Sequence, residues 1–589
     1  MARAILFGTP VSSGIALGKV RIIHSAGTVD ERHIQPADCA NETERLLSAV
    51  AQVTADLQAA CDQVPAGLSE QCDIIHAHIQ LCQDPKLLGA AKKRICEQHI
   101  CASWALGQTV EELCALFQSM NDAYLRERAQ DIKAVSLRLQ QRIAGTNLYK
   151  HDTCAPHILL AEDISPSDVL SLNPRVMQGL VTMEGGPTSH TAIVARSLHL
   201  PAVVGVTGLI DAVADGDFII VDAISGSIYI APDNDELVNF TTRQEEFGAW
   251  EHTVHANAAL PAETLDGVRV AVQANMENTE ESAAVLASGA EGVGLYRTEF
   301  AYLRSRSLPR EEQLYEEYAA IVRRIAPQRV VFRTLDAGAD KMLTSQMALK
   351  EPNPNLGLRG IRFCLRHREV FYPQLRALLR VAALGSVALM IPMVTGLQEV
   401  QEVRRMIVEV SQSLSAAGIE HDATVPLGVM IETPSAVLVA DSLARECDFF
   451  SIGTNDLLCY TMAIDRSNKH VAYLHDPLHP AMVLSLKRVI DCAHREGIGV
   501  SVCGELSTDP YGLALLIGMG VDSVSASSSA VPAMKHMIRQ LHAETCTDMA
   551  HSVLMSTDSA ASGRMLRETL AQSLGEELTF HHTMLQTNG

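Results

Sequence analysis

Hydrophobic and polar positions follow a helical pattern in one part of the chain and strand-like patterns on either side of it. Between about residues 40 and 145, long stretches rich in Ala, Leu, Gln and Glu contain few Gly or Pro residues, which favours helix. Breaks at residues 65–67, at Asp84-Pro85 and near residues 121–122 divide this region into about four helices. The pattern predicts a helical bundle.

Short apolar runs lie before and after the helical region. Those that predict strands are residues 15–23, 157–160 and 177–183, with a hairpin at 218–222 and 226–230. We expect residues 1–23 and 148–231 to form one α/β domain, with the helical residues 24–147 inserted into it. A polar helix at 232–262 would then be a linker.

From about residue 267, apolar strands alternate with helices. The predicted strands are residues 268–273, 292–296, 329–333, 388–392, 427–431, 449–453 and 499–503. Roughly eight strand and helix units in about 280 residues match a (β/α)8 barrel, which typically needs about 250 residues. We assign residues 263–589 to this barrel domain, with one or two polar helices after about residue 545.

Length and composition are those of a multidomain protein of ordinary solubility. The chain has 589 residues, 47% hydrophobic and 20% charged, so three or four domains are expected. No apolar run reaches the ~18 residues of a membrane span, and the first 20 residues lack the continuous apolar core of a signal peptide. These features predict a cytoplasmic protein without membrane insertion.

Charge and cysteine content narrow the chemistry further. The net charge of −22 disfavours nucleic acid and anionic membranes as partners, and it suits a partner with a basic face. The 14 cysteines are scattered and form no Cys-x-x-Cys pair, which argues against a zinc site or a redox pair.

A glycine-rich turn, residues 185–190, leads from a predicted strand into a helix predicted at 191–198 and places His190 at the helix start. Unpaired N–H groups there favour a nearby anion by roughly 0.3–1 kcal/mol. Since free histidine has a pKa of about 6.5, much of it is neutral and nucleophilic at physiological pH. A phosphoryl group on His190 could also be met by the hydroxyls of Thr188, Ser189 and Thr191. The alternative is a structural loop whose histidine caps or packs.

Charged and polar residues follow the C-terminal ends of the predicted barrel strands, where barrel enzymes hold their reactive groups. They are Arg297, Arg333, Glu432, Asn455, Asp456 and Cys503, with Arg359 and Arg466 in loops expected on the same face. Arginine binds phosphate and carboxylate in bidentate fashion, carboxylates bind Mg2+, and a thiol can donate a proton. Each residue alone could be structural, but the ordered set is improbable by chance.

These motifs resemble known families. The segment around His190, followed by an Ala-x-x-x-Ala-Arg type helix and Leu-Pro-Ala-Val-Val-Gly at 200–205, is similar to the phosphohistidine signature of Enzyme I of the phosphoenolpyruvate-dependent sugar phosphotransferase system, pyruvate phosphate dikinase and phosphoenolpyruvate synthase. The barrel segments, in their order, resemble Enzyme I, as does the helical insertion, in which that family docks its phosphocarrier. The resemblance extends from about residue 5 to 540.

The resemblance to Enzyme I implies an α/β multidomain chain: a swivelling phosphohistidine domain with an inserted helical bundle, followed by a (β/α)8 barrel that dimerises. It implies that His190 takes the phosphoryl group of phosphoenolpyruvate and passes it to a histidine of a small HPr-like carrier, releasing pyruvate in the first step of sugar uptake. Substrate would be bound by Arg297, Arg333, Arg359, Asn455, Asp456 and Arg466. Glu432 and Asp456 would hold Mg2+, Cys503 would donate a proton, and His78 and Asp84 would dock the carrier.

Three departures from the Enzyme I pattern suggest a paralogue that serves another carrier or sugar. Pro187 replaces a usual arginine, residues 337–340 replace a more glycine-rich loop, and the docking helix is less acidic. A non-catalytic or regulatory paralogue is therefore one alternative. A dikinase or synthase is another, but these enzymes need an ATP-grasp domain, and the chain before residue 150 is too short and too helical to contain it.

Overall fold

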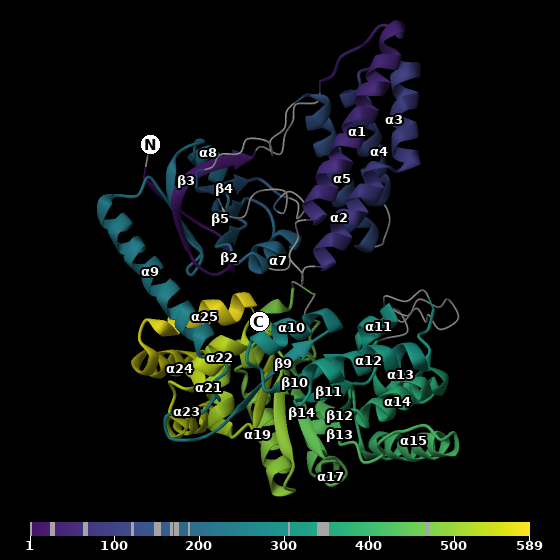
Figure 1. Ribbon diagram of the computed structural model, residues 1–589. Coiled ribbons are helices and arrows are strands. Elements are labelled where there is room, and N and C mark those ends of the chain that lie inside the picture. The colour runs from purple at the N-terminus through teal and green to yellow at the C-terminus, as the bar shows by residue number, and fades with distance from the viewer. Residues whose placement is uncertain are drawn as a thin grey trace. The chain divides into compact units, whose positions relative to one another are not determined.

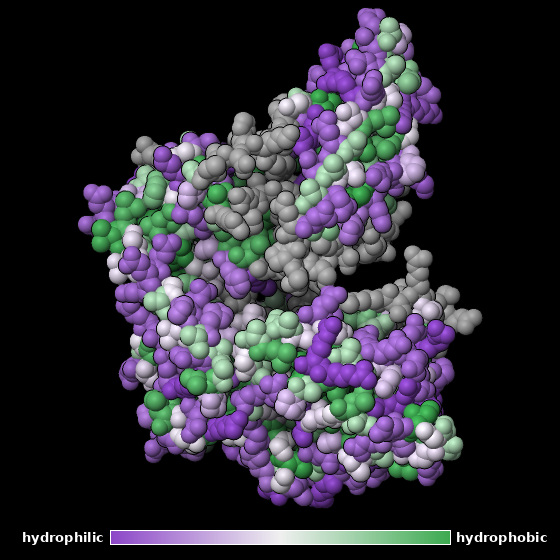
Figure 2. All heavy atoms as spheres, in the orientation of Figure 1, coloured by the Kyte–Doolittle hydropathy of each residue, from purple (hydrophilic) through white to green (hydrophobic). Residues whose placement is uncertain are grey.

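The computed structural model forms two compact units, Met1–Ala249 and Trp250–Gly589 (Figure 1). The residues that it describes are 3–23, 30–62, 69–118, 123–145, 155–164, 169, 176–186, 189–303, 307–337, 353–465, 468 and 470–588. Within these ranges, every helix is too short or too polar to cross a membrane. Hydrophilic residues are spread over the face of each unit that is in view in Figure 2, as expected for a chain with 20% charged residues.

An eight-stranded mixed sheet forms the core of part of the first unit. Its strands run in the order β1-β8-β7-β3-β4-β5-β6-β2, and β3 to β6 are parallel neighbours. The bounds are β1 (Ala4–Phe7), β2 (Thr9–Ser12), β3 (Ile15–Ile23), β4 (His157–Ala161), β5 (Met177–Thr182), β6 (Ala202–Val204), β7 (Phe218–Asp222) and β8 (Ser227–Ile230). Strand β3 precedes the helical region and β4 follows it, yet they are paired. The predicted hairpin of β7 and β8 is confirmed.

Five α-helices are described between β3 and β4 in sequence, one more than the pattern predicted. They are α1 (Cys39–Asp62), α2 (Ser69–Cys82), α3 (Pro85–Gln98), α4 (Ala102–Gln118) and α5 (Ala123–Ile143). Their apolar faces meet in one core, in which Leu46, Leu57, Ile75 and Leu139 are fully buried. The region is therefore helical as predicted, but the prediction of about four helices was one helix short.

The break that the sequence did not reveal lies between α3 and α4. His99 ends α3 in the left-handed conformation, with φ at 51°, although Gly or Asn is usual there. Ile100 then pairs with His33 in an isolated bridge, and its side chain is 2% exposed. Because burial of Ile100 and pairing with a distant segment terminate the helix, no local Gly or Pro marks the position.

A closed barrel of eight parallel strands forms the second unit, so the predicted fold class is confirmed. The strands are β9 (Ala271–Met276), β10 (Gly292–Arg297), β11 (Arg329–Arg333), β12 (Val387–Ile391), β13 (Leu427–Ile431), β14 (Phe449–Gly453), β15 (Gly499–Cys503) and β16 (Ser523–Ala526). Strand β16 was not predicted, because it has only four residues and two of them are serines. Helix α9 (Asn234–Ala256) occupies the predicted linker, while the functional domain boundaries stay predictions.

The barrel interior is filled, and helices complete its outer layer. Leu295, Val331, Met390 and Met430 belong to one central cluster of buried residues, which also contains Cys503, so the barrel interior is a packed core rather than a pore. After β16 come α22 (Val531–Ile538), α23 (Ala543–Met555), α24 (Ser559–Leu574) and α25 (Glu577–Asn588). The final stretch thus contains three helices rather than the one or two that were predicted.

Candidate active site

The predicted histidine motif lies at the start of helix α7 (His190–Ser197). His190 is its first residue, and the hydroxyl of Ser189 caps the helix by accepting the Ala192 N–H at 3.2 Å. The buried hydroxyl of Thr191 donates to the Ile164 carbonyl at 2.6 Å, so its proton is not available to a phosphoryl group, contrary to our expectation. Pro187, Thr188 and the side chain of His190 lie outside the described residues.

A cavity of about 430 Å3 lies in the barrel unit and collects the barrel residues predicted from sequence. Its lining is formed by Asn275, Leu295, Arg297, Glu299, Phe300, Leu303, Arg333, Asp336, Ala337, Arg359, Met430, Glu432, Gly453, Asn455, Asp456, Cys503 and Gly504. Arg466 lies outside the described residues. Arg297, Arg333 and Cys503 are the last residues of their strands, and parallel strands in a barrel end at the same opening, which explains why they meet.

Arg333 is held among three carboxylates. Its guanidinium pairs with Glu299 and, at 3.0 Å, with Asp336. Burial lowers the pKa of Arg333, but the charges of Glu299, Asp336 and Glu432 outweigh burial and raise it, so the side chain stays cationic. Its Nε–H is buried and has no hydrogen-bond partner among the described residues. An unpaired donor on a fixed cation is suited to an anionic ligand.

Arg359 connects two of the carboxylates. It contacts Asp336 through Nε at 3.2 Å and Nη2 at 2.9 Å, and Nη2 also lies 3.1 Å from Asp456. Its Nη1 donates to the Tyr460 hydroxyl at 3.2 Å. Burial lowers the pKa of Arg359, yet Asp336 and Asp456 raise it overall. The loop arginine that sequence placed on this face is therefore in the cavity and fixed in position.

Glu432 is the most deeply buried carboxylate of the cavity, with 1% of its surface exposed. Its Oε1 accepts the Met393 N–H at 2.6 Å. Burial, and then the charges of Asp336 and Asp456, raise the pKa of Glu432 to about 8. Carboxylates that raise one another's pKa in this way are suited to a cation, because a cation removes their repulsion. The residues present therefore fit a metal ion.

Asp456 and Asn455 come from the first turn of α18 (Thr454–Met462). The Asn455 amide donates to Glu505 at 3.1 Å, and its oxygen accepts the Glu505 N–H at 3.1 Å. These two bonds fix the amide at the rim of the cavity. The carboxylate of Asp456 is 31% exposed, which leaves part of it open to a ligand.

Cys503 lines the cavity with a buried thiol that is 4% exposed. Its sulfur lies 3.5 Å from the Ser451 hydroxyl and 3.6 Å from the Ile452 carbonyl. Burial raises the pKa of this thiol, although Ser451 and Arg333 lower it in part. The thiol is consequently protonated at neutral pH and can act as a proton donor.

The next residue, Gly504, has φ at 120°, and a Cβ there would lie 2.4 Å from Thr454 Oγ1, so a larger residue would not fit at this position.

Two carboxylates of the site were not selected from the sequence. Asp336 is 3% exposed on its side chain and joins Arg333 to Arg359, while Glu299 pairs with Arg333. Each stands two or three residues beyond a strand-end arginine. The sequence therefore contained a signal for these two carboxylates, because an arginine that is buried at the end of a strand requires acidic partners close by.

The carrier-docking residues predicted in the helical group have structural contacts. His78 is 1% exposed, and its Nε2 lies 3.4 Å from Asp131 of α5. Such burial argues against direct contact of the imidazole with a docked protein, while a role of His78 in carrier docking stays a prediction. Asp84 caps α3 by accepting the N–H groups of Lys86 and Leu87 at 2.6 and 3.2 Å.

Family models match three parts of the chain. Residues 251–543 match the PEP-binding domain of PEP-utilising enzymes, 7–128 their N-terminal region and 154–226 their mobile domain. The barrel cavity lies within the first of these ranges. The chain is therefore an enzyme of the PEP-utilising class, and enzymes of this class use a metal.

Whole-chain relatives define the family more narrowly. The chain is 36% identical over 555 residues to a phosphoenolpyruvate-protein phosphotransferase of Bacillus sp. (strain S), covering 93% of this chain and 95% of the relative. It is 35% identical over 549 residues to one of Staphylococcus epidermidis, covering 93% and 96%. The chain belongs to the phosphoenolpyruvate-protein phosphotransferases. A solution structure of an Enzyme I protein is 29% identical to this chain, and the match covers 41% of this chain and 99% of that structure, with a TM-score of 0.35.

Proposed function

We propose that this enzyme transfers the phosphoryl group of phosphoenolpyruvate to its own His190 and then to a histidine of a small HPr-like carrier. The observation that carries the proposal is the barrel cavity, where fixed arginines, clustered carboxylates and a protonated thiol meet. Family membership supports the same reaction. We further propose that the protein acts in the cytoplasm as a homodimer, in the first step of sugar uptake.

The arginines bind the two anionic ends of the substrate. Arg297, Arg333 and Arg359 line the cavity, and the unpaired Nε–H of Arg333 supplies one donor to the ligand. Asn455, held by Glu505, supplies a neutral donor for an oxygen of the phosphate or carboxylate. We assign Arg466 to the same task from its motif alone.

Glu432 and Asp456 would hold Mg2+, for which carboxylate oxygens are the preferred ligands. Bound there, Mg2+ would supply electrostatic stabilisation of the negative charge that develops on the phosphate and the enolate oxygen. Arg359 then has a second task, because its contact with Asp456 orients that carboxylate in the absence of the ion.

Cys503 completes the formation of pyruvate. Phosphoryl transfer breaks the enol C–O–P bond at the oxygen–phosphorus link, forms a P–N bond to His190 and leaves pyruvate enolate. The Cys503 thiol gives its proton to the terminal carbon of the enolate, and the thiolate regains a proton from water. The pKa of this thiol is raised by burial, which keeps the proton in place until the enolate forms.

The phosphoryl group has to leave on a protein. We propose that the domain bearing α7 swivels between the barrel and a carrier that docks on the helical group, where Asp84 holds the start of α3. His78 contributes by joining α2 to α5 rather than by touching the carrier.

The proposal can be tested by incubation with labelled phosphoenolpyruvate and Mg2+. We expect acid-labile label on the wild-type protein, none on His190→Ala, and loss of the label to a histidine carrier with release of pyruvate. Label of equal extent on His190→Ala would contradict the assignment of the acceptor. Phosphorylation from ATP without phosphoenolpyruvate would instead favour a dikinase-like reaction.

A further inference from the structure

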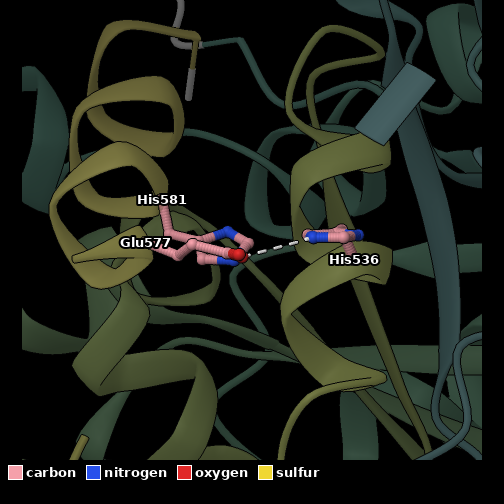
Figure 3. Close-up of side chains that lie close together, drawn as sticks. All are labelled: His536, Glu577 and His581. Atoms are coloured by element: carbon pink, nitrogen blue, oxygen red, sulfur yellow. Dashed lines mark ion pairs between the residues drawn. The ribbon is translucent and has the colours of Figure 1, made fainter. Parts of the chain in front are cut away.

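A second group of metal-binding side chains lies outside the lining of the active-site cavity. His536 of α22 faces Glu577 and His581 of α25, as Figure 3 shows. One potential ligand atom of each residue lies within 4.8 Å of the others, and His536 Nε2 is 3.5 Å from Glu577 Oε2. Glu577 and His581 are four residues apart, so they lie on the same face of α25.

One buried ring nitrogen of His581 makes no hydrogen bond within the part of the chain that the structure describes. Its ring is fully buried and Nε2 lies 3.0 Å from Gln540 Oε1, while no described residue offers a hydrogen-bond partner to Nδ1. Burial, followed by the charge of His536, lowers the pKa of His581 to about 3, so the ring is neutral. An unsatisfied buried polar atom is unfavourable, and such an atom requires an explanation.

Gln540 and Trp250 form hydrogen bonds to Glu577 and His581, as neighbouring residues commonly do to the side chains that bind a metal ion. The Gln540 amide donates to Glu577 Oε2 at 2.7 Å while its oxygen contacts His581 Nε2, and the Trp250 indole N–H donates to Glu577 at 3.2 Å. Metal-ligating histidines usually donate their second N–H to such an oxygen. The side chain of Glu577 is 42% exposed and that of His536 13%, which gives an ion a route from solvent.

We propose that His536, Glu577 and His581 bind a divalent transition-metal ion of the zinc type, which fastens α25 to α22. Two imidazoles and one carboxylate are a common ligand set for Zn2+, with a water in the fourth position. Mg2+ prefers oxygen ligands, so this site differs in kind from the carboxylates of the active site. Ligand atoms around tetrahedral zinc are about 3.3 Å apart, so the group must contract on binding, and the exposed end of Glu577 has room to move.

The first test measures binding of Zn2+ alone to the full-length protein after treatment with a chelator, in excess Mg2+ and a thiol-free buffer. We compare the wild type with His536→Gln and Glu577→Gln, which alter partly exposed residues. The matched control is His494→Gln, which removes a surface histidine paired with Asp522 at 3.1 Å. The wild type and the control should bind one Zn2+ more than the two variants, or bind it at least about tenfold more tightly. Equal stoichiometry and affinity in all four proteins would overturn the proposal.

The second test uses the fluorescence of Trp250, which contacts Glu577, to show that the ion binds at the proposed site. The chain has two tryptophans, Trp104 and Trp250, so Trp104→Phe leaves Trp250 as a single fluorophore. Co2+ should quench its fluorescence in a saturable way, Zn2+ should compete, and Glu577→Gln should abolish the effect. Unchanged quenching in Glu577→Gln would show that the ion binds elsewhere and would refute the site. Turnover of phosphoenolpyruvate, which we expect to be unchanged in these variants, checks that they are folded.

Discussion

The barrel cavity and the five-helix group differ in how far a residue's position in sequence determined its place in the fold. In the barrel, each described residue that was selected from sequence lines the cavity, including Arg333, Glu432 and Cys503. In the helical group, His78 is turned into the core and Asp84 caps a helix. The end of a parallel barrel strand has one location, the common opening, whereas a helical residue can face any direction.

The difference also concerns electrostatics. In the cavity, charged groups are buried and depend on each other, as shown by Arg333 among Glu299, Asp336 and Glu432. In the helical group, the carboxylate of Asp84 caps α3, and other ionisable side chains form pairs between helices, such as Arg94 with Glu112 and His78 with Asp131. Substitutions in the cavity should therefore affect catalysis strongly, while those in the helical group should affect stability modestly.

Loss of the proton donor should have the largest effect. Cys503→Ala should reduce pyruvate release by about 10²–10⁴-fold, because the enolate then has no positioned acid. A coupled lactate dehydrogenase assay measures the rate. The control is Cys447→Ala, which removes another buried cysteine that does not line the cavity. Equal activity of the two variants would make Cys503 a packing residue and remove the contrast between the regions.

Removal of the Arg333 guanidinium should have the second-largest effect on activity. Arg333→Met should lower kcat/KM for phosphoenolpyruvate by about 10²–10³-fold, as expected for loss of a preorganised donor to the phosphate. Steady-state kinetics measure it, and Arg404→Met is the control, because Arg404 pairs with Asp448 outside the cavity. A change confined to thermal stability would assign Arg333 a structural role alone.

Asp336 tests whether the network itself is important for stability. Asp336→Asn leaves the buried cations Arg333 and Arg359 without their shared partner, which should cost about 3–5 kcal/mol. Calorimetry of the full chain should show the loss as a downward shift of one transition. Asp448→Asn, which removes one exposed partner of Arg404, should cost no more than about 1 kcal/mol. Similar shifts for both would argue against a coupled network.

The smallest effect is expected in the helical group. Asp84→Ala should reduce stability by about 0.5–2 kcal/mol through loss of the helix cap, whereas Asp84→Asn should retain most of it. Labelling of His190 by phosphoenolpyruvate should not change in either variant. If Asp84→Asn weakened transfer to the carrier while stability was kept, Asp84 would touch the carrier after all.

The sequence by itself determined the fold class, seven of the barrel strands and a group of residues that line the cavity, but not its carboxylates Glu299 and Asp336. Period-two and continuous apolar runs are local properties, and the residue that ends a parallel strand has its location fixed by the barrel. For the same reason Arg297, Arg333, Glu432 and Cys503 could be selected without any structure.

Only the tertiary structure decided which groups are partners. His99 ends a helix because Ile100 is buried, β16 forms from a sequence with weak strand preference, and Asp336 becomes the shared partner of two arginines. It also turned His78 into the core and brought His536 to Glu577 and His581. These outcomes depend on packing and charge between residues far apart in sequence, which local patterns do not encode.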